Sequence, residues 1–207
     1  MDTAWHLALY RITVAALFCL PFVTARATTL PPIHLSQLFH DADVVALVQV
    51  TSGETMGAGD ESCGARYSAR VIDDFKGTSK GATIEFGNHF GYEIGSRYII
   101  FLVGPGRTYE PMMSTNSMQL NARAEHEKRC GAMLRRSTVM HSGNGALRVH
   151  WVTDFKYQDG AAVPTRYVVL PDGVSMIPAK ITETNEYSGE VWVRLPDMTK
   201  LLRDLGG

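Results

Sequence analysis

Short stretches of β-type sequence, separated by glycine-rich turns, are the feature that most restricts the fold of this chain. In residues 65–75, Tyr67, Ala69 and Val71 alternate with polar neighbours, as expected of a strand with one buried face. Similar patterns predict strands at 44–50, 82–86, 96–104, 146–152, 164–170, 175–183 and 189–195. Strands this short, with turn signals between them, are typical of a small barrel or sandwich.

One of these segments differs from the others. Residues 44–50, VVALVQV, are almost wholly apolar and rich in β-branched side chains. We expect such a strand to be buried on both faces or to close a barrel. The glycine- and serine-rich stretch 51–62 that follows it predicts a loop. Pro178 predicts that 175–183 is an edge strand or a broken one.

Three helices are predicted around these strands. Leu35, Leu38 and Phe39 have helical spacing in 35–43, residues 120–136 are rich in helix formers, and 196–207 reads as a short closing helix. The fold class is therefore mainly β with flanking helices. The irregular stretch 105–119 would allow two subdomains, but a single domain is favoured.

The first 27 residues read as an export signal. Arg11 precedes an apolar run of 12 residues, ITVAALFCLPFV, and the sequence at 25–27, ARA, supplies small residues for cleavage. The run is shorter than the roughly 20 residues that span a bilayer, although a retained anchor is the alternative. We therefore predict a signal peptide at 1–27, a single β-rich domain at 28–207, a periplasmic or secreted location, and no stable membrane insertion after cleavage.

The charge balance limits the partners. Of 20 basic and 21 acidic side chains, the signal takes two and one, which leaves a net charge near −2. A chain of this charge has no general attraction to nucleic acid or to anionic membranes. We expect a protein or another ligand of unknown identity as the partner, and no nucleic acid.

Two cysteines, Cys63 and Cys130, remain after the signal. An even number in an exported protein is most simply explained by one disulfide. Free thiols or a metal site are the alternatives.

Two patterns resemble catalytic motifs. In HEKRC, residues 126–130, His126 and Cys130 have the spacing of a zinc-binding helix, with Glu127 placed as a general base. The other reading, a surface helix that carries half of a disulfide, is favoured because Cys63 competes for Cys130. The string GTSKG around Ser79 matches a nucleophile elbow, but a strand pattern follows it where the motif needs a helix. No catalytic residue, metal or cofactor is predicted.

The loop NHFGYEIG, residues 88–95, is the candidate binding site. It places His89, Phe90, Tyr92 and Glu93 between two strands, where binding residues often lie. Its aromatic side chains are expected either to form a contact patch or to cover the open end of a barrel core.

Three motifs carry a resemblance to a known family: ADVV at 42–45, V-x-x-x-F-K-G at 71–77 and GSRYIIFL at 95–102. With them, residues 35–104 resemble the tissue-inhibitor-of-metalloproteinase-like and netrin-like modules of exported bacterial proteins. The resemblance implies an OB-like, five-stranded Greek-key barrel in 35–104, with a helix and additional C-terminal strands in 105–207. The animal inhibitors bind protease zinc through an N-terminal cysteine, whereas this mature chain would begin at Thr28, so that mechanism does not carry over.

The leading functional hypothesis is an exported, non-catalytic OB-like domain that binds a partner through its loops. The alternatives are an exported, metal-assisted hydrolase that uses His126 and Glu127, and a purely structural component of the envelope. Fold analogy alone does not decide between them.

Overall fold

The structure is a computed structural model. It describes residues 33–58, 61–87, 89–105, 125, 128–130, 137–140, 145–158, 161–171, 174–175, 177–184 and 189–207. Residues 32–207 group into one compact unit. The predicted signal at 1–27 and most of the predicted helix at 120–136 lie outside the described residues, so the signal and the domain boundary at residue 28 stay predictions.

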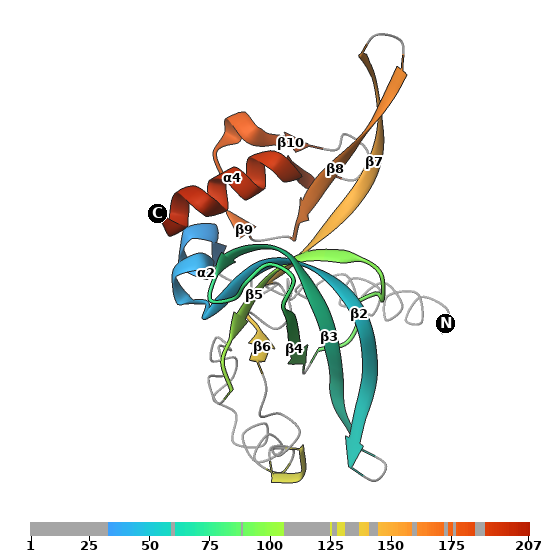
Figure 1. The fold of residues 1–207 in the computed structure, drawn as a ribbon, viewed down its shortest axis with the longest axis vertical. Helices are drawn as coiled ribbons and strands as arrows, with labels where there is room; N and C mark the ends of the chain where they lie inside the picture. The colour runs from blue at the N-terminus through green and yellow to red at the C-terminus, as the bar shows by residue number, and fades with distance from the viewer. Residues whose placement is uncertain are drawn as a thin grey trace, which may run out of the picture. The chain divides into compact units, whose positions relative to one another are not determined.

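The described part of the chain is mainly β with a few helices (Figure 1). The strands are β1 Ile33–His34, β2 Val44–Ala58, β3 Glu61–Lys76, β4 Thr83–Gly87, β5 Arg97–Val103, β6 Ser137–Val139, β7 Ala146–Gln158, β8 Ala161–Leu170, β9 Val174–Ser175, β10 Thr182–Thr184 and β11 Val191–Arg194. The helices are α2 Leu35–Asp41, α4 Leu195–Gly206 and the 3-10 turn η2 Ala179–Ile181. The predicted class, mainly β with flanking helices, is confirmed.

Nine strands form one sheet, in the order β10-β11-β8-β7-β5-β2-β3-β4-β6. The short strand β6 pairs with β4 in parallel and with β5 in antiparallel orientation. Strands β2, β3, β4, β6 and β5 therefore pair in a closed ring. Beyond β5, the strands β7, β8, β11 and β10 extend the sheet as antiparallel neighbours (Figure 1).

The first part of strand β2, residues 45–48, is buried on both faces, as VVALVQV predicts. Val45 and Leu47 belong to one hydrophobic cluster. Ala46 and Val48, which alternate with them, belong to another. Strand β5 divides its side chains between the same two clusters, so β2 and β5 form the wall that separates the two cores.

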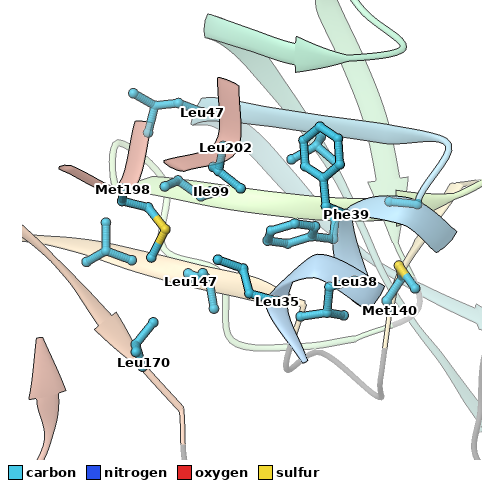
Figure 2. Packing of buried hydrophobic residues seen from close by; sticks show 14 of the residues in the cluster. Leu35, Leu38, Phe39, Leu47, Ile99, Met140, Leu147, Leu170, Met198 and Leu202 are labelled. Carbon is cyan, nitrogen blue, oxygen red and sulfur yellow. The ribbon is translucent and has the colours of Figure 1, made fainter. Parts of the chain in front are cut away.

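The helix-covered core lies on the side of this wall that faces α2 and α4 (Figure 2). Its buried members are Leu35, Leu38, Phe39, Ala42, Val45, Leu47, Ile99, Phe101, Val103, Met140, Leu147, Val168, Leu170, Val193, Leu195, Met198 and Leu202. The ring core lies on the other side, between the ring strands. Its buried members are Ala46, Val48, Val50, Ala65, Tyr67, Ala69, Val71, Phe86, Tyr98, Ile100, Leu102 and Val139.

Helix α4 closes the helix-covered core. Leu195, Met198 and Leu202 are buried, and their spacing places them on one face of the helix. Arg203 follows Leu202 at the flank of this face, and its Nη2 donates to Asp73 Oδ2 of β3 at 2.7 Å. The predicted closing helix is thus present, and an ion pair as well as apolar packing holds it to the sheet.

The predicted loop at 51–62 is wrong. Most of these residues extend β2 and β3 into a long hairpin, with Gly53 opposite Tyr67 and Thr55 opposite Ala65. Pairing with β3 satisfies the backbone groups of this polar segment, and such pairing outweighs the weak strand preference of glycine and serine. The break predicted at Pro178 is confirmed, because β9, the turn η2 and β10 replace one continuous strand.

The three sequence motifs meet at the junction where β2 begins. The backbone N–H of Asp43 donates to Leu102 O at 2.8 Å, and its carboxylate accepts from Gly104 N at 2.7 Å. Lys76 Nζ donates to the last carbonyls of α2, Phe39 O at 3.0 Å and His40 O at 2.8 Å. The motifs thus join α2, β2, β3 and β5 at one end of the ring, which is a structural role.

Candidate functional site

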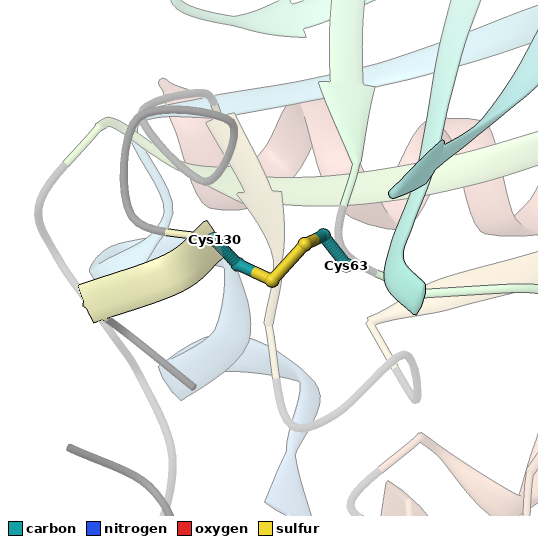
Figure 3. Close-up of a disulfide and its surroundings, with 2 residues drawn as sticks. All are labelled: Cys63 and Cys130. Atoms are coloured by element: carbon teal, nitrogen blue, oxygen red, sulfur yellow. A yellow bond between two sulfur atoms is a disulfide. The ribbon is translucent and has the colours of Figure 1, made fainter. Parts of the chain in front are cut away.

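The structure pairs Cys63 with Cys130, as predicted. The sulfur atoms are at bonding distance and the Cα atoms are 5.4 Å apart, within the range of protein disulfides (Figure 3). Both cysteines are buried, Cys63 on β3 and Cys130 in a segment that is helical at 128–130. The disulfide therefore ties strand β3 of the ring to a residue that lies 67 positions later in the chain.

The candidate binding loop lies at the end of the ring where β4 ends and β5 begins. Its Tyr92 packs into that end, with its ring centroid 5.1 Å from Tyr67, 5.4 Å from Phe86 and 5.4 Å from Tyr98. All three contacts are edge-on, the arrangement that aromatic rings prefer to face-to-face stacking. Tyr92 therefore covers the ring core, the second of the two roles expected for this loop.

The hydroxyl group of Tyr92 is buried and has no hydrogen-bond partner among the described residues. Burial raises the pKa of Tyr92 above its ordinary value, and the neighbouring Tyr67 and Tyr98 add to that shift. The phenol therefore stays neutral at physiological pH and acts as a packing group rather than as an acid or a base.

Two neighbours of Tyr92 in the same loop point outward instead. Phe90 is 57 % exposed and Ile94 is 65 % exposed, although both are large and apolar. His89 is half-buried. The sequence did not single out Ile94, because a lone aliphatic residue in a loop carries no motif.

Glu93 fixes the loop between these exposed residues. Its carboxylate forms an ion pair with Arg148 of β7 and accepts from Ser96 Oγ at 3.2 Å. Its backbone N–H donates to the hydroxyl of Tyr98 at 3.1 Å. The loop therefore presents Phe90 and Ile94 from a backbone that is held to both β5 and β7.

The two motifs that resemble catalytic sites gain no support. His126 and Glu127 lie outside the described residues, so the zinc-helix hypothesis stays a prediction. Ser79 lies in the turn between β3 and β4, where its carbonyl accepts from Ala82 N at 3.1 Å, and no helix follows it. Within the described residues, no group of three or more His, Cys, Asp or Glu side chains is arranged to hold a metal ion.

A second group of polar side chains lies on the strands that extend the sheet. Arg194 Nε donates to Glu183 Oε1 at 3.0 Å, and this hydrogen bond, with the charge of Glu183, raises the pKa of Arg194. Tyr167 is buried between these strands and its ring lies 5.6 Å from that of Trp192. These contacts tie β8, β10 and β11 together.

His150 of β7 lies in this region and is predicted to make stability depend on pH. Burial lowers its pKa, and Arg148 lowers it further, while Glu190 and Glu93 oppose the shift. The unfolded chain, with a pKa near 6.5, binds this proton more tightly than the folded one. The neutral histidine therefore stabilises the folded state, fully above pH 6.5, and this stabilisation is lost as the pH falls through the lowered pKa.

We expect urea unfolding of His150→Gln to show a weaker loss of stability between neutral pH and pH 5 than wild type. An equal loss, or an NMR titration midpoint of His150 above 6.5, would contradict this.

Trp151 of β7 is a third exposed apolar residue, 61 % exposed, which no sequence pattern marked. The guanidinium carbon of Arg166 lies 4.0 Å from the centre of its ring. This pair belongs to β7 and β8, the strands that continue the sheet beyond β5.

Comparisons with protein-family models, with curated proteins and with solved structures found no match for this chain. A search of the helices in the described ranges found none that is both long and apolar enough to cross a bilayer.

Proposed function

We propose that this chain is an exported, non-catalytic binding domain built on an OB-like barrel. In this proposal it binds a protein or another ligand through the loop at residues 89–95.

The pairing of the strands supports the OB-like part of the proposal. An OB fold is a small, partly open Greek-key barrel of five strands. Five strands pair here in a closed ring, and the parallel pair β4–β6 requires a crossover between strands that are not consecutive. The relation to inhibitor-like and netrin-like modules is proposed from the three motifs, which meet at one junction.

The exposure of Phe90 and Ile94 is the observation that carries the binding function. Exposed apolar side chains that lie close together often mark interaction sites. The packing of the partly buried Tyr92 and the ion pair of Glu93 with Arg148 hold the loop in place, so little conformational freedom is lost when a partner binds.

Export is supported by the pairing of Cys63 with Cys130. Disulfides form and persist in oxidising compartments, and both sulfurs here are buried. This agrees with the signal predicted at 1–27.

The proposal predicts that loss of the loop's apolar side chains abolishes partner binding. The mature protein and a Phe90→Ser/Ile94→Ser variant would be immobilised and exposed to envelope extract, and the retained proteins compared by mass spectrometry. We expect at least one protein to be retained by wild type and its yield to fall about tenfold or more on the variant. Burying two such side chains contributes roughly 1.5–3 kcal/mol each.

The matched control is Leu205→Ser, because Leu205 is also a partly exposed apolar residue, 38 % exposed, but lies on α4. It should retain the partner as wild type does. Repeated failure of wild type to retain any protein would count against the binding function. Equal retention by the loop variant would move the site elsewhere.

A further inference from the structure

A row of polar side chains crosses the sheet on the same face as the helix-covered core. Gln49 of β2 lies opposite Arg70 of β3 on one side and opposite Arg97 of β5 on the other. On each of the three strands, the residue two positions from the row packs in or against the helix-covered core. These residues are Leu47 on β2, Ile72 on β3 and Ile99 on β5, so the row lies on the same face of the sheet as that core. Arg70 is exposed, whereas Gln49 and Arg97 are half-buried.

Beside Arg97 the row reaches Val149 of β7, and an arginine–tryptophan pair lies on the same face two residues beyond it, on β7 and β8. Trp151 lies opposite Arg166, and two residues further along these strands Val149 and Val168 belong to the helix-covered core and its margin. Arg166 stacks on Trp151, and its Nε is shielded from solvent without a hydrogen-bond partner among the described residues. Arg70, Arg97 and Arg166, with Gln49 and Trp151, are called the arginine face below.

The charges of this face are not balanced by carboxylates in the part of the chain that the structure describes. Burial and the nearby charge of Arg97 lower the pKa of Arg166, so the two guanidinium groups lie close enough to repel each other. Arg66, four positions along β3 from Arg70, differs because it forms an ion pair with Glu54. Like charges held together without counterions cost stability, and such a cost is common at functional sites.

The arginine face adjoins the binding loop. Gln49 Nε2 donates to Gly95 O at 3.0 Å, and Gly95 N donates to Val50 O at 2.8 Å. The exposed Ile94 precedes Gly95 in the chain. Apolar side chains on the loop and guanidinium groups on the sheet therefore lie around the start of β5 and the middle of β2.

From this placement we infer that the arginine face binds an acidic segment of a partner protein. This rests on the proposed function, since it names the chemistry of the partner that a binding domain would take. Guanidinium groups bind carboxylates through paired hydrogen bonds, and Arg166 is already oriented by its stack on Trp151.

The spacing of the strands suggests the pattern of that segment. Arg70 and Arg97 lie two strands apart in one row, which places their Cα atoms about 10 Å apart. Arg166 also lies two strands from Arg97 but is offset by two residues along the strand, which makes that separation about 12 Å. Residues three positions apart in a polyproline II segment are about 9 Å apart and point the same way, because that helix has three residues per turn and a rise of about 3.1 Å per residue. Acidic residues at every third position, with apolar residues between them, would match the face and the exposed residues of the loop. Nucleic acid is less suited, because the chain as a whole has no positive charge excess.

The test uses a fluorescent peptide with Glu at every third position and Leu and Ser between, and a second peptide with Gln in place of Glu. We expect fluorescence anisotropy to show that the mature protein binds the Glu peptide at least tenfold more tightly than the Gln peptide. Arg97→Gln and Arg166→Gln should each weaken binding roughly tenfold, the typical effect of a charged hydrogen bond. Arg70→Gln should weaken it less, because Arg70 is the most exposed of the three.

Two variants remove the same charge elsewhere. Arg66→Gln removes an arginine already paired with Glu54, and Lys200→Gln removes an exposed lysine on α4. Neither should change the affinity by more than twofold. Equal weakening by Arg66→Gln would show unspecific attraction and would overturn the inference. So would equal binding of the two peptides, or tighter binding of oligo-dT through the same arginines.

The two proposals fail in different ways. If envelope extract yields a partner on wild type and equally on Arg97→Gln and Arg166→Gln, the arginine face is not its site, while the binding function stands. If wild type retains nothing and the Glu peptide also fails to bind, both are wrong. Thermal unfolding of each variant would show whether the fold is kept, and we expect it to be, because the Arg97 and Arg166 side chains make no hydrogen bond, ion pair or ring contact beyond the stack of Arg166 on Trp151 among the described residues.

Discussion

Replacing Cys63 and Cys130 together by alanine is expected to lower the free energy of unfolding by about 4 kcal/mol. The disulfide closes a loop of 67 positions, and its loss returns that much conformational freedom to the unfolded chain. For a domain of this size the melting temperature should fall by roughly 10 °C. Urea unfolding of the mature wild-type protein and of the double variant at neutral pH would measure the difference.

Reduction provides the matched control for this prediction. Reductant should lower the melting temperature of wild type and leave that of the double variant unchanged. Wild type denatured without reductant should show no free thiol. Two free thiols, or equal stability of the two proteins, would contradict the pairing of Cys63 with Cys130 and weaken the argument for an oxidising compartment.

Local periodicity was enough to find most of the ring. The alternation of Tyr67, Ala69 and Val71 with polar residues marked the buried face of β3, and all three are buried in the ring core. The continuous apolar run at 44–50 marked a strand with two buried faces. Both signals depend only on which side chains need burial, so they can be read before the partners of each strand are known.

The closure of the ring could not be read in this way. Strand β6 has only the three residues Ser137–Val139, and its importance comes from pairing with both β4 and β5. The strand pairing of 51–58 with β3 was missed for a related reason, because that pairing determines the structure of this segment more than its own composition does.

The candidate site was only partly accessible from sequence. The loop was found, but periodicity could not tell that Tyr92 would pack against the ring core and Phe90 would be exposed, because both are aromatic and differ only in what they pack against. Arg70, Arg97 and Arg166 lie far apart in the sequence. They share a face only through the register of five neighbouring strands, and no local pattern records that register.

Gly77→Ala is expected to destabilise the fold by about 3 kcal/mol or more. Gly77 has a φ of +69°, a conformation that costs an alanine about 1–2 kcal/mol. A Cβ atom there would also lie 1.9 Å from the carbonyl oxygen of Asp43, so the start of β2 would have to move. Strain from overpacking of this kind typically adds another 1–3 kcal/mol.

Gly81→Ala separates these two causes. Gly81 also has a positive φ, +84°, but an added Cβ would meet no atom within 4 Å. Its cost should be only that of the backbone conformation, about 1–2 kcal/mol, and urea unfolding of both variants would measure the difference. Equal stability of the two variants would mean that the close approach between the motif residues Asp43 and Gly77 is not needed.

The same pair of variants tests whether the junction and the binding surface are independent. The junction at Asp43, Gly77 and Gly104 lies where β5 ends, whereas the loop and the arginine face lie where β5 begins. At a temperature where both proteins are fully folded, Gly77→Ala should therefore bind the Glu peptide within twofold of wild type, despite its lower stability. A large loss of affinity would mean that the start of β2 also determines the position of Gln49 and the loop, since β2 carries both the junction and the centre of the arginine face.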